Sequence, residues 1–366
     1  MSSSTMNLAR EKTRKIMLGG VAIGGGAPVS VQTMANTDTR DVKASVESVK
    51  AFGRAGCDIV RFAVPDMAAA EALGEIKRAC PEMPLVADIH FDWRLAIKSI
   101  ESGVDGLRIN PGNIGGKDKV LAVANAAKAR GIPIRIGVNA GSLDAALREK
   151  FGGATPEALV ESAMQHVRLL EEVDFYDIKI SVKASDIDRT LAAYRLLSQT
   201  TNYPLHLGLT EAGTFLAGTV RSSVALGILL SEGIGDTVRI SLTDDPIKEV
   251  KAGLELLRCL KLRAPGPNVT SCPTCGRTKA DVFTTANRVE ELLEQYYHDN
   301  PNAPRPHVAV MGCVVNGPGE AKDAEVALVG GDNCFFLYVK GERMSKHSVE
   351  EAPGVIVEYI RGLNNV

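Results

Sequence analysis

The sequence has no long uninterrupted run of apolar residues. No segment approaches the roughly 20 consecutive apolar residues that a transmembrane helix needs, so we expect no membrane span and no membrane partner. The Ser-rich, basic start of the chain lacks the apolar core of a secretory signal peptide. Without such a signal, the seven cysteines are expected to be reduced thiols with metal or catalytic uses, not a disulfide scaffold. We therefore predict a cytoplasmic protein.

The chain also lacks an excess of charge of either sign. Its 42 Lys and Arg residues face 44 Asp and Glu residues, which gives a formal net charge of −2 over 366 residues. This balance provides no overall positive charge for binding nucleic acid. With 45% hydrophobic and 23% charged residues, the composition is typical of a globular protein, and the length is sufficient for two domains.

Short β-branched runs alternate with helical patterns from Pro28 to about Leu262, which is the rhythm of a parallel sheet. The runs begin at residues 28, 58, 84, 105, 132, 176, 204 and 237. Eight β/α units over this length fit a (β/α)8 barrel, which typically takes about 250 residues. An open doubly wound sheet is the alternative, although it would normally need fewer strands. We predict an α/β chain with a TIM-type barrel followed by a small α+β domain.

The segment "KLRAPGPNVTS" interrupts this rhythm with two prolines and a glycine. We therefore expect a barrel domain over residues 1–264 and a second domain over residues 265–366. The second domain has helical patterns near 281–298 and 349–363, and strand patterns in "HVAVMG", "EVALVG" and "CFFLYVK". The glycine-rich "GGVAIGGGAPV" precedes a strand, whereas a phosphate loop follows one, so we expect a hairpin or turn there.

Basic and polar residues recur at the predicted carboxyl ends of the barrel strands, where barrel active sites lie. They are Arg61, Arg108, Asn110, Arg135, Asn139, Lys179, Lys183, His206, Glu211, Arg239 and Ser241. Pairs such as 108/110 and 239/241 have even spacing, so both members point to one face of a strand. For any single arginine here, the alternative to ligand binding is an ordinary ion pair at the end of a strand. Converging cations nevertheless repel one another without an anion between them, and guanidinium groups suit phosphate oxygens. We predict a small ligand that carries more than one phosphate.

Asp88, His90 and Asp92 in "ADIHFDW" raise a competing hypothesis of a hydrolytic metal site at a strand end. No second cluster of histidines at other strand ends completes such a site. We therefore favour a polar strand end that leads into the helix near Trp93.

Cys272 and Cys275 form a Cys-x-x-Cys pair, which by itself fits a zinc knuckle, a redox pair or half of an iron–sulfur site. A zinc ribbon would need a second knuckle, and only the isolated Cys313 and Cys334 follow. Glu320, at the end of "MGCVVNGPGE", is a candidate fourth ligand beside three thiolates. A carboxylate is a weakly held ligand for cluster iron, so that iron would be open to a substrate oxygen. Zinc is the alternative metal, and Cys334 is the rival fourth ligand or a core residue.

Cys57, Cys80 and Cys259 lie in helical or strand-edge patterns without further candidate ligands near them. We expect them to be small buried residues.

Five motifs, "SCPTCGRT", "GCVVNGPGE", "LHLGLTEAG", "SVKASD" and "LLSEGIGDTVRISL", closely resemble the bacterial 4-hydroxy-3-methylbut-2-enyl diphosphate synthases of the methylerythritol phosphate isoprenoid pathway. The resemblance runs from about Pro28 into the C-terminal domain and weakens after Gly331. It does not account for Cys334. It implies a [4Fe-4S] cluster held by Cys272, Cys275, Cys313 and Glu320.

The resemblance also implies an activity, which is the two-electron ring opening and dehydroxylation of 2-C-methyl-D-erythritol 2,4-cyclodiphosphate. Flavodoxin or ferredoxin would supply the electrons. Glu211 would be the acid–base residue, and Glu320 would act at the cluster. The family's solution is a head-to-tail homodimer in which one subunit's cluster domain caps the other's barrel. The implied substrate-binding residues are Arg61, Asp88, Arg108, Asn110, Arg135, Asn139, Lys183, His206, Arg239 and Ser241.

Three other functions compete with this hypothesis. A zinc-stabilised barrel could act on phosphorylated substrates without redox chemistry. A pterin-dependent barrel of the dihydropteroate synthase type would leave Cys272, Cys275, Cys313 and Glu320 without a task. A pure electron carrier would not need the arginine-lined barrel.

Overall fold

The computed structural model describes residues 10–110, 114–315, 319 and 322–364. The chain divides into two compact units, of which the first ends at Arg263 and the second begins at Ala264. Each unit has its own hydrophobic core. No helix among the described residues is both long enough and apolar enough to cross a membrane.

The first unit contains a parallel barrel of eight strands. Hydrogen bonding gives the order β8-β7-β6-β5-β4-β3-β10-β9, and a parallel bridge between Ile180 and Leu205 joins the two end strands. This confirms the predicted (β/α)8 fold, and the open doubly wound alternative is wrong. The strands are β3 (Ser30–Met34), β4 (Ile59–Ala63), β5 (Leu85–Ile89), β6 (Gly106–Ile109), β7 (Ile134–Asn139), β8 (Ile178–Lys183), β9 (His206–Leu207) and β10 (Thr237–Val238).

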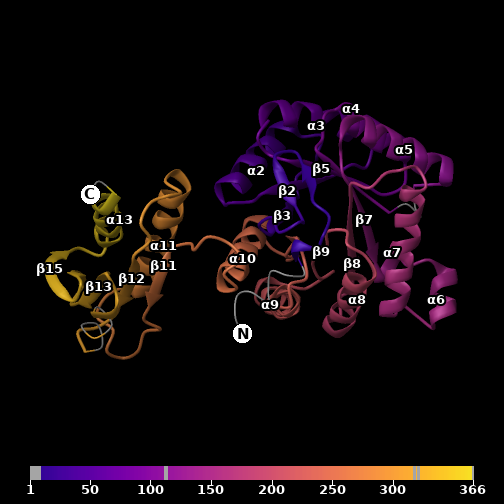
Figure 1. Ribbon diagram of the computed structural model, residues 1–366. Helices are drawn as coiled ribbons and strands as arrows, with labels where there is room; N and C mark the ends of the chain where they lie inside the picture. Colours follow the sequence, from indigo (N-terminus) through magenta and orange to yellow (C-terminus); the bar gives the residue numbers. More distant parts are fainter. Residues whose placement is uncertain (1–9, 111–113, 316–318, 320–321, 365–366) are drawn as a thin grey trace. The chain divides into compact units, whose positions relative to one another are not determined.

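Helices follow the strands and surround the barrel (Figure 1). They are α2 (Val42–Arg54), α3 (Met67–Ala79), α4 (Trp93–Glu101), α5 (Lys117–Arg130), α6 (Ala145–Phe151), α7 (Pro156–Glu171), α8 (Ile187–Thr200), α9 (Phe215–Ser231) and α10 (Pro246–Cys259). Many of them begin at an aspartate whose side chain accepts a hydrogen bond from a first-turn N–H group. These caps are Asp41, Asp66, Asp92, Asp144, Asp186 and Asp245. The sequence therefore sets where each of these helices starts.

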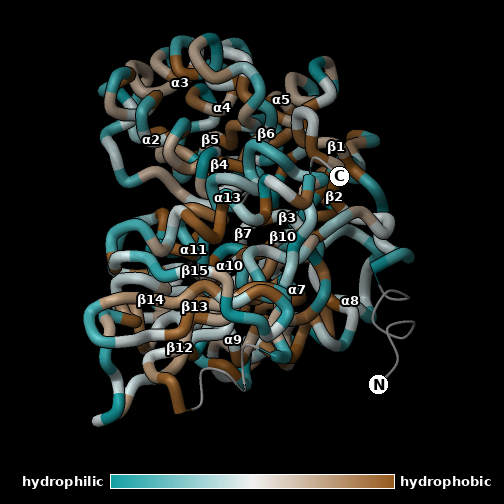
Figure 2. Tube along the Cα trace, turned by 90° about the vertical axis from the view of Figure 1, so that its left-hand side faces the viewer, coloured by the Kyte–Doolittle hydropathy of each residue, from teal (hydrophilic) through white to brown (hydrophobic). Residues whose placement is uncertain are grey.

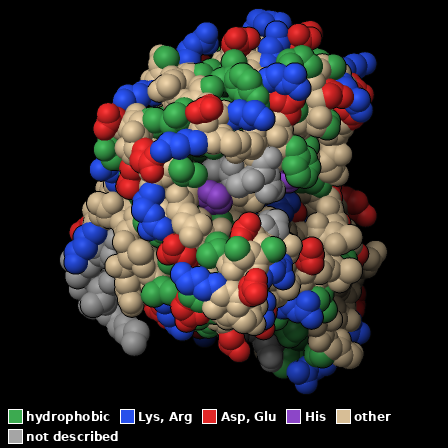
Figure 3. Space-filling model, turned by 90° about the vertical axis from the view of Figure 1, so that its right-hand side faces the viewer, with side chains coloured by type: hydrophobic (Ala, Val, Ile, Leu, Met, Phe, Trp, Pro, Cys, Tyr) green, Lys and Arg blue, Asp and Glu red, His purple; other side chains and the backbone are tan. Residues whose placement is uncertain are grey.

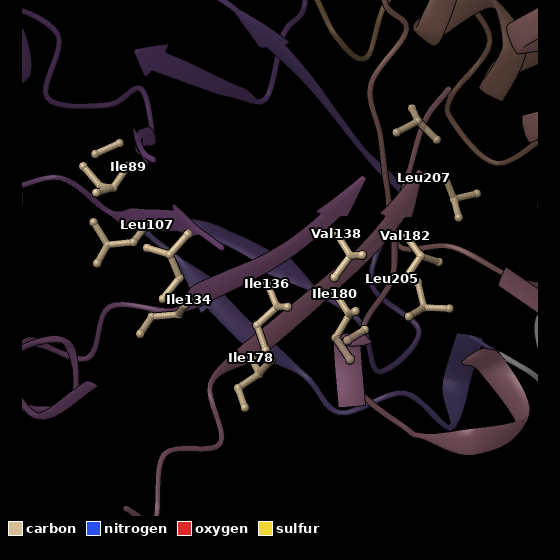
Figure 4. Packing of buried hydrophobic residues seen from close by; sticks show 14 of the residues in the cluster. Ile89, Leu107, Ile134, Ile136, Val138, Ile178, Ile180, Val182, Leu205 and Leu207 are labelled. Carbon is tan, nitrogen blue, oxygen red and sulfur yellow. The ribbon is translucent and has the colours of Figure 1, made fainter. Parts of the chain in front are cut away.

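Side chains alternate along the strands between the helical layer and the barrel interior. In β7 and β8 the apolar residues pack outward into the core (Figure 4), and they are Ile134, Ile136, Val138, Ile178, Ile180 and Val182. The residues between them point the other way, and they are Arg135, Gly137, Asn139, Lys179, Ser181 and Lys183. Barrel interiors are usually filled by Val, Ile and Leu. Here a large part of the interior is polar and cationic.

A hairpin of β1 (Ile16–Leu18) and β2 (Val21–Ile23) closes the amino end of the barrel. Leu18 packs with Ile59 and Val86, which lie near the starts of β4 and β5. A Cβ atom on Gly106 would lie 3.1 Å from a methyl carbon of Leu18, so this glycine leaves room for the hairpin. The predicted hairpin in the glycine-rich segment is confirmed.

The second unit is a five-stranded mixed sheet with two helices packed on one face. Its elements are β11 (Asn268–Ser271), α11 (Val282–Asp299), β12 (His307–Met311), β13 (Val326–Gly331), β14 (Cys334–Val339), β15 (Glu342–His347) and α13 (Ala352–Asn364). Strands β11, β12 and β13 are parallel, and β14 and β15 are antiparallel additions. The predicted strands β12, β13 and β14 and both helices are confirmed.

Two strands of this sheet escaped prediction. Strand β11 follows the prolines of the expected linker, and β15 is a largely exposed edge strand with the polar sequence ERMSKH. Neither has the apolar alternation that identifies a half-buried strand. Figure 2 shows the contrast, because hydrophobic residues follow the strands of the core while hydrophilic residues follow turns and edges.

Leu18→Ala is expected to destabilise the barrel unit by about 2–5 kcal/mol, because it leaves a cavity under the hairpin. Met17 is 47% exposed, so Met17→Ala in the same strand is the matched control and should stay within about 0.5 kcal/mol. The only tryptophan is Trp93, in α4, so its fluorescence during denaturant unfolding reports on the barrel unit alone. Equal stability of the two variants would show that the hairpin does not support the barrel.

Candidate active site

Asp88 lies at the centre of an ion-pair cluster inside the barrel. It is 3% exposed, and its Oδ1 accepts a hydrogen bond of 3.1 Å from Nη1 of Arg108. Its Oδ2 lies 3.5 Å from Nε of Arg61 and 3.5 Å from Nε2 of His90. Burial alone would raise the pKa of Asp88, but Arg61, the His90 contact and Arg108 outweigh burial and hold that pKa well below its usual range. Asp88 is therefore a permanent carboxylate that orients two guanidinium groups.

Two further arginines are anchored from neighbouring elements. Arg135 donates through Nη1 to Ser181 Oγ over 2.8 Å. Arg239 contacts Ser241 and donates through Nη2 to Glu249 Oε1 over 3.1 Å. Glu249 lies in the first turn of α10 and is 3% exposed. Sequence reasoning missed it, because an acidic residue in a first helical turn is ordinarily explained by the helix dipole.

The interior holds more positive than negative charge. The basic residues are Arg61, Arg108, Arg135, Lys179, Lys183 and Arg239, and the buried carboxylates that act on them are Asp88, Glu249 and, at Lys179, Asp236. Figure 3 shows charges of both signs mixed over the face in view, so the concentration of positive charge belongs to the barrel interior and not to that face.

This surplus changes the protonation of the buried bases. Burial, and next the charge of Arg135, lower the pKa of Lys179 to about 7. The same two causes hold the pKa of Lys183 and that of His206 well below their ordinary values. Each shift has the sign expected when a charged form is both desolvated and repelled. The site therefore favours the entry of an anion.

Several buried polar nitrogen atoms inside the barrel have no hydrogen-bond partner. They include the Nε atoms of Arg61, Arg108, Arg135 and Arg239 and the ring nitrogens of His206. The Arg61 Nε atom is close enough to Asp88 for an ion pair, but it is not aligned for a hydrogen bond. Buried polar groups are normally satisfied. Donors left over in this way are suited to a ligand with many acceptor oxygens.

Two glycines make room for the basic side chains. A Cβ atom on Gly137 would lie 2.5 Å from Nε of Arg108, and one on Gly208 would lie 2.5 Å from Nζ of Lys183. Both glycines occupy inward positions, where any larger residue would displace a cation. The "RIGVN" and "LHLGL" segments therefore need glycine for close approach, as well as their polar residues.

The remaining predicted site residues lie at the carboxyl ends of the strands. Asn110 is buried after β6, and Asn139 is half-buried at the end of β7. Glu211 is exposed in the loop after β9 and has a φ of 55°. Positive φ is uncommon outside glycine and often marks a functional position. Residues 111–113, which follow Asn110 in the sequence, lie outside the described residues.

The alternative metal site at Asp88, His90 and Asp92 finds no support in how these side chains are used. Asp92 caps α4, with its Oδ1 accepting from the Arg94 N–H over 2.9 Å, and it also pairs with the Arg94 side chain. Asp88 is bound by arginines. These two carboxylates therefore serve different partners.

In the second unit, Cys272 and Cys313 follow the ends of adjacent parallel strands. Cys272 comes directly after β11 and its N–H donates to Val310 O in β12 over 2.9 Å. Cys313 comes two residues after the end of β12 and is buried. Carboxyl ends of parallel strands meet at one edge of a sheet, so these two thiols belong to the same edge.

Cys275 lies in the loop that leaves this edge. Its N–H donates to Thr278 Oγ1 over 3.0 Å, and its carbonyl accepts from the Thr278 N–H over 3.0 Å. A Cβ atom on Gly312 would lie 3.0 Å from the Thr278 methyl carbon. The Cys275 loop therefore packs on the backbone that precedes Cys313.

Among the described residues, no group of three or more His, Cys, Asp or Glu side chains is arranged so that it could hold a metal ion. The predicted ligand Glu320 lies outside the described residues. The donor types still fit a metal centre, because Cys272 and Cys313 follow strands that end at one sheet edge, Cys275 lies in the loop after it, and soft thiolates suit iron–sulfur clusters or zinc. A cavity of about 610 Å³ at this edge is lined by Cys313 and also by Cys334.

The other cysteines differ in how far they are exposed to solvent. Cys57 and Cys334 are buried and Cys80 is half-buried. The expectation that Cys259 is buried is wrong, because it is exposed near the end of α10. A helical pattern alone does not say which side of the helix faces solvent at its last turn.

One solved structure resembles this chain at the level of fold. HPPK-DHPS from Plasmodium falciparum matches with a TM-score of 0.50 and 11% identity, covering 70% of this chain and 52% of that chain. Identity this low shows a shared fold alone.

Sequence comparison gives much closer relatives. A 4-hydroxy-3-methylbut-2-en-1-yl diphosphate synthase (flavodoxin) from Ruminiclostridium cellulolyticum is 53% identical over 98% of this chain and 99% of its own length. One with the same name from Geobacter sulfurreducens is 56% identical over 92% of this chain and 94% of its own length. Residues 13–254 match the GcpE TIM-barrel domain, and residues 268–362 match the GcpE protein C-terminal domain. With both units matched in order, the chain belongs to the GcpE family.

Proposed function

We propose that this chain converts 2-C-methyl-D-erythritol 2,4-cyclodiphosphate to (E)-4-hydroxy-3-methylbut-2-enyl diphosphate by reductive ring opening and dehydroxylation, in isoprenoid precursor biosynthesis. The names of relatives that are more than half identical support this reaction. The observation that carries the proposal is the surplus of buried, incompletely paired cations inside the barrel. A cyclic diphosphate supplies the missing negative charge and the acceptor oxygens.

The barrel domain, residues 1–264, would bind the diphosphate. Arg61 and Arg108, already oriented by Asp88, would offer donors to phosphate oxygens, and Arg135 and Arg239 would add two more guanidinium groups. The remaining contacts would come from Asn110, Asn139, Lys183, His206 and Ser241.

The C-terminal domain, residues 265–366, would hold a [4Fe-4S] cluster through Cys272, Cys275, Cys313 and Glu320. When bound, the cluster would pass on, one at a time, the two electrons that the dehydroxylation requires. Flavodoxin, which appears in the names of the relatives, or ferredoxin would be the electron donor. The thiols at the ends of β11 and β12 support this assignment.

Glu211 would deliver the proton with which the hydroxyl group leaves as water. Its loop begins at the carboxyl end of β9, on the side of the barrel that carries the cations. A positioned carboxylic acid is suited to that step.

We further propose a cytoplasmic homodimer in which the cluster domain of one subunit caps the barrel of the other. This arrangement would bring the reducing centre to the bound diphosphate. Neither nucleic acid nor a membrane is required as a partner.

Protein purified without oxygen is expected to be brown and to contain about four irons with matching sulfide per chain. Cys313→Ser should lose most of the iron, because a buried thiolate ligand is removed. Cys259→Ser is the matched control, since Cys259 is exposed on a barrel helix. Zinc in colourless protein would refute the reductive mechanism and favour phosphate-ester chemistry. Normal iron in Cys313→Ser would refute only the ligand assignment.

Glu211→Gln should retain the iron content and lower kcat by about 10²–10⁴-fold, which is the usual contribution of a general acid or base. Glu75→Gln, which changes an exposed carboxylate on α3, should leave turnover unchanged. The measurement is turnover of the cyclic diphosphate with a reduced donor in excess. Unchanged turnover in Glu211→Gln would remove this residue from the mechanism.

Binding of the diphosphate should be accompanied by proton uptake. The pKa of Lys183 is held well below its ordinary value by burial and neighbouring arginines, so the free site disfavours the ammonium form. A bound anion favours the ammonium form, raises that pKa and draws a proton from solution. Affinity should accordingly rise as pH falls toward the lowered pKa of Lys183.

Calorimetry in two buffers with different ionisation enthalpies measures this uptake directly. Lys183→Met should reduce the number of protons taken up, because it removes the titrating amine. Binding heats that do not depend on the buffer would contradict the assignment.

A further inference from the structure

Glu249 is a buried carboxylate that accepts three hydrogen bonds from two other segments, β3 and the stretch after β10. Its Oε1 accepts from Arg239 Nη2 over 3.1 Å and from the Leu242 N–H over 2.9 Å. Its Oε2 accepts from Thr33 Oγ1, in β3, over 3.0 Å. Charge-assisted hydrogen bonds of this kind are stronger than neutral ones. One side chain of α10 therefore ties together β3, an arginine of the anion site and the loop after β10.

The loop after β10 is in turn bonded to the loop that carries Glu211. The Thr243 N–H, next to the residue held by Glu249, donates to Gly213 O over 3.0 Å. A Cβ atom on Gly218, in α9, would lie 2.6 Å from a methyl carbon of Leu242 and 2.9 Å from Gly213 O. The two loops and the first turn of α9 are thus packed in direct contact.

The Glu211 loop depends on such contacts because its backbone is unusual. Glu211 has a φ of 55° and Gly213 a φ of 120°, and a non-glycine residue at positive φ persists only where its surroundings hold it. Besides the bond from Thr243, the carbonyl of Ala212 accepts from Arg221 Nη1 over 3.2 Å.

We propose that Glu249 is a positioning residue with two effects. It fixes the Arg239 guanidinium for the bound anion, and through Leu242 and Thr243 it fixes the loop that places Glu211. The proposal rests on the proposed function for the identity of the substrate and for the role of Glu211. It accounts for a buried glutamate that bonds to β3 and to the stretch after β10, while Asp245 caps its helix.

Direct binding and turnover separate these two effects. Glu249→Gln should weaken binding of the cyclic diphosphate and of inorganic pyrophosphate by about tenfold or more, as expected when a hydrogen bond to a charged group is lost. It should also lower kcat. Glu255→Gln is the matched control, because Glu255 lies on the same helix with its side chain 65% exposed, and it should change neither quantity.

Double-mutant cycles then test the route of each effect. In an Arg239→Gln background, Glu249→Gln should weaken pyrophosphate binding no further, because the group that it orients is gone. In a Glu211→Gln background, Glu249→Gln should no longer lower kcat. Fully additive effects in both backgrounds would overturn the proposal, since they would show that Glu249 acts on neither partner.

The binding cycle also distinguishes failure of this inference from failure of the proposed function. If the protein binds pyrophosphate but does not turn over the cyclic diphosphate, the reaction assignment fails while the Arg239 cycle still decides the role of Glu249. Trp93 fluorescence reports whether each variant is folded. Should Glu249→Gln not fold, Thr33→Val removes only the Oε2 contact and should give a smaller loss of affinity in the same direction. No loss in that folded variant would count against the proposal.

Discussion

Mutual repulsion of cations inside the barrel is the constraint to which much of the first unit is adapted. Several arginines and lysines lie on inward positions of neighbouring strands, where desolvation and repulsion oppose their charged forms. Two buried carboxylates, Asp88 and Glu249, offset part of this cost and fix the direction of the guanidinium groups that they bind. Pairing is incomplete, so the folded chain retains an electrostatic driving force that only an anion can satisfy.

The fold tolerates this arrangement because most of the hydrophobic core lies on the other face of the strands. Alternation along β7 and β8 sends isoleucines and valines to the helices, so the core that stabilises the barrel lies outside the strand cylinder. Glycines at two inward positions then give Arg108 and Lys183 the space that larger residues would occupy. Stability and ligand binding are thereby assigned to opposite faces of the same strands.

Local patterns revealed most of this architecture, and contacts between distant segments account for what they missed. Apolar runs located all eight barrel strands, and the even spacing of residues such as Arg108 and Asn110 located the inward face on which the basic residues lie. Glu249 was missed because its partners, Thr33 and Arg239, come from other elements and only folding brings them together. Strands β11 and β15 were missed because their residues are held by strand pairing more than by burial. The side of α10 that Cys259 occupies likewise depended on packing, not on sequence period.

The hairpin of β1 and β2 closes one end of the barrel. Leu18 and its neighbours fill the amino end with apolar side chains. A charged molecule that reaches the arginines from the carboxyl end would therefore leave by the same end. Substrate and product of the proposed reaction both carry two phosphates and would use the same passage in opposite directions. Each turnover would then require the product to leave before the next substrate enters. The rate of product release would therefore depend on the loops at the carboxyl end of the barrel and on whatever covers them.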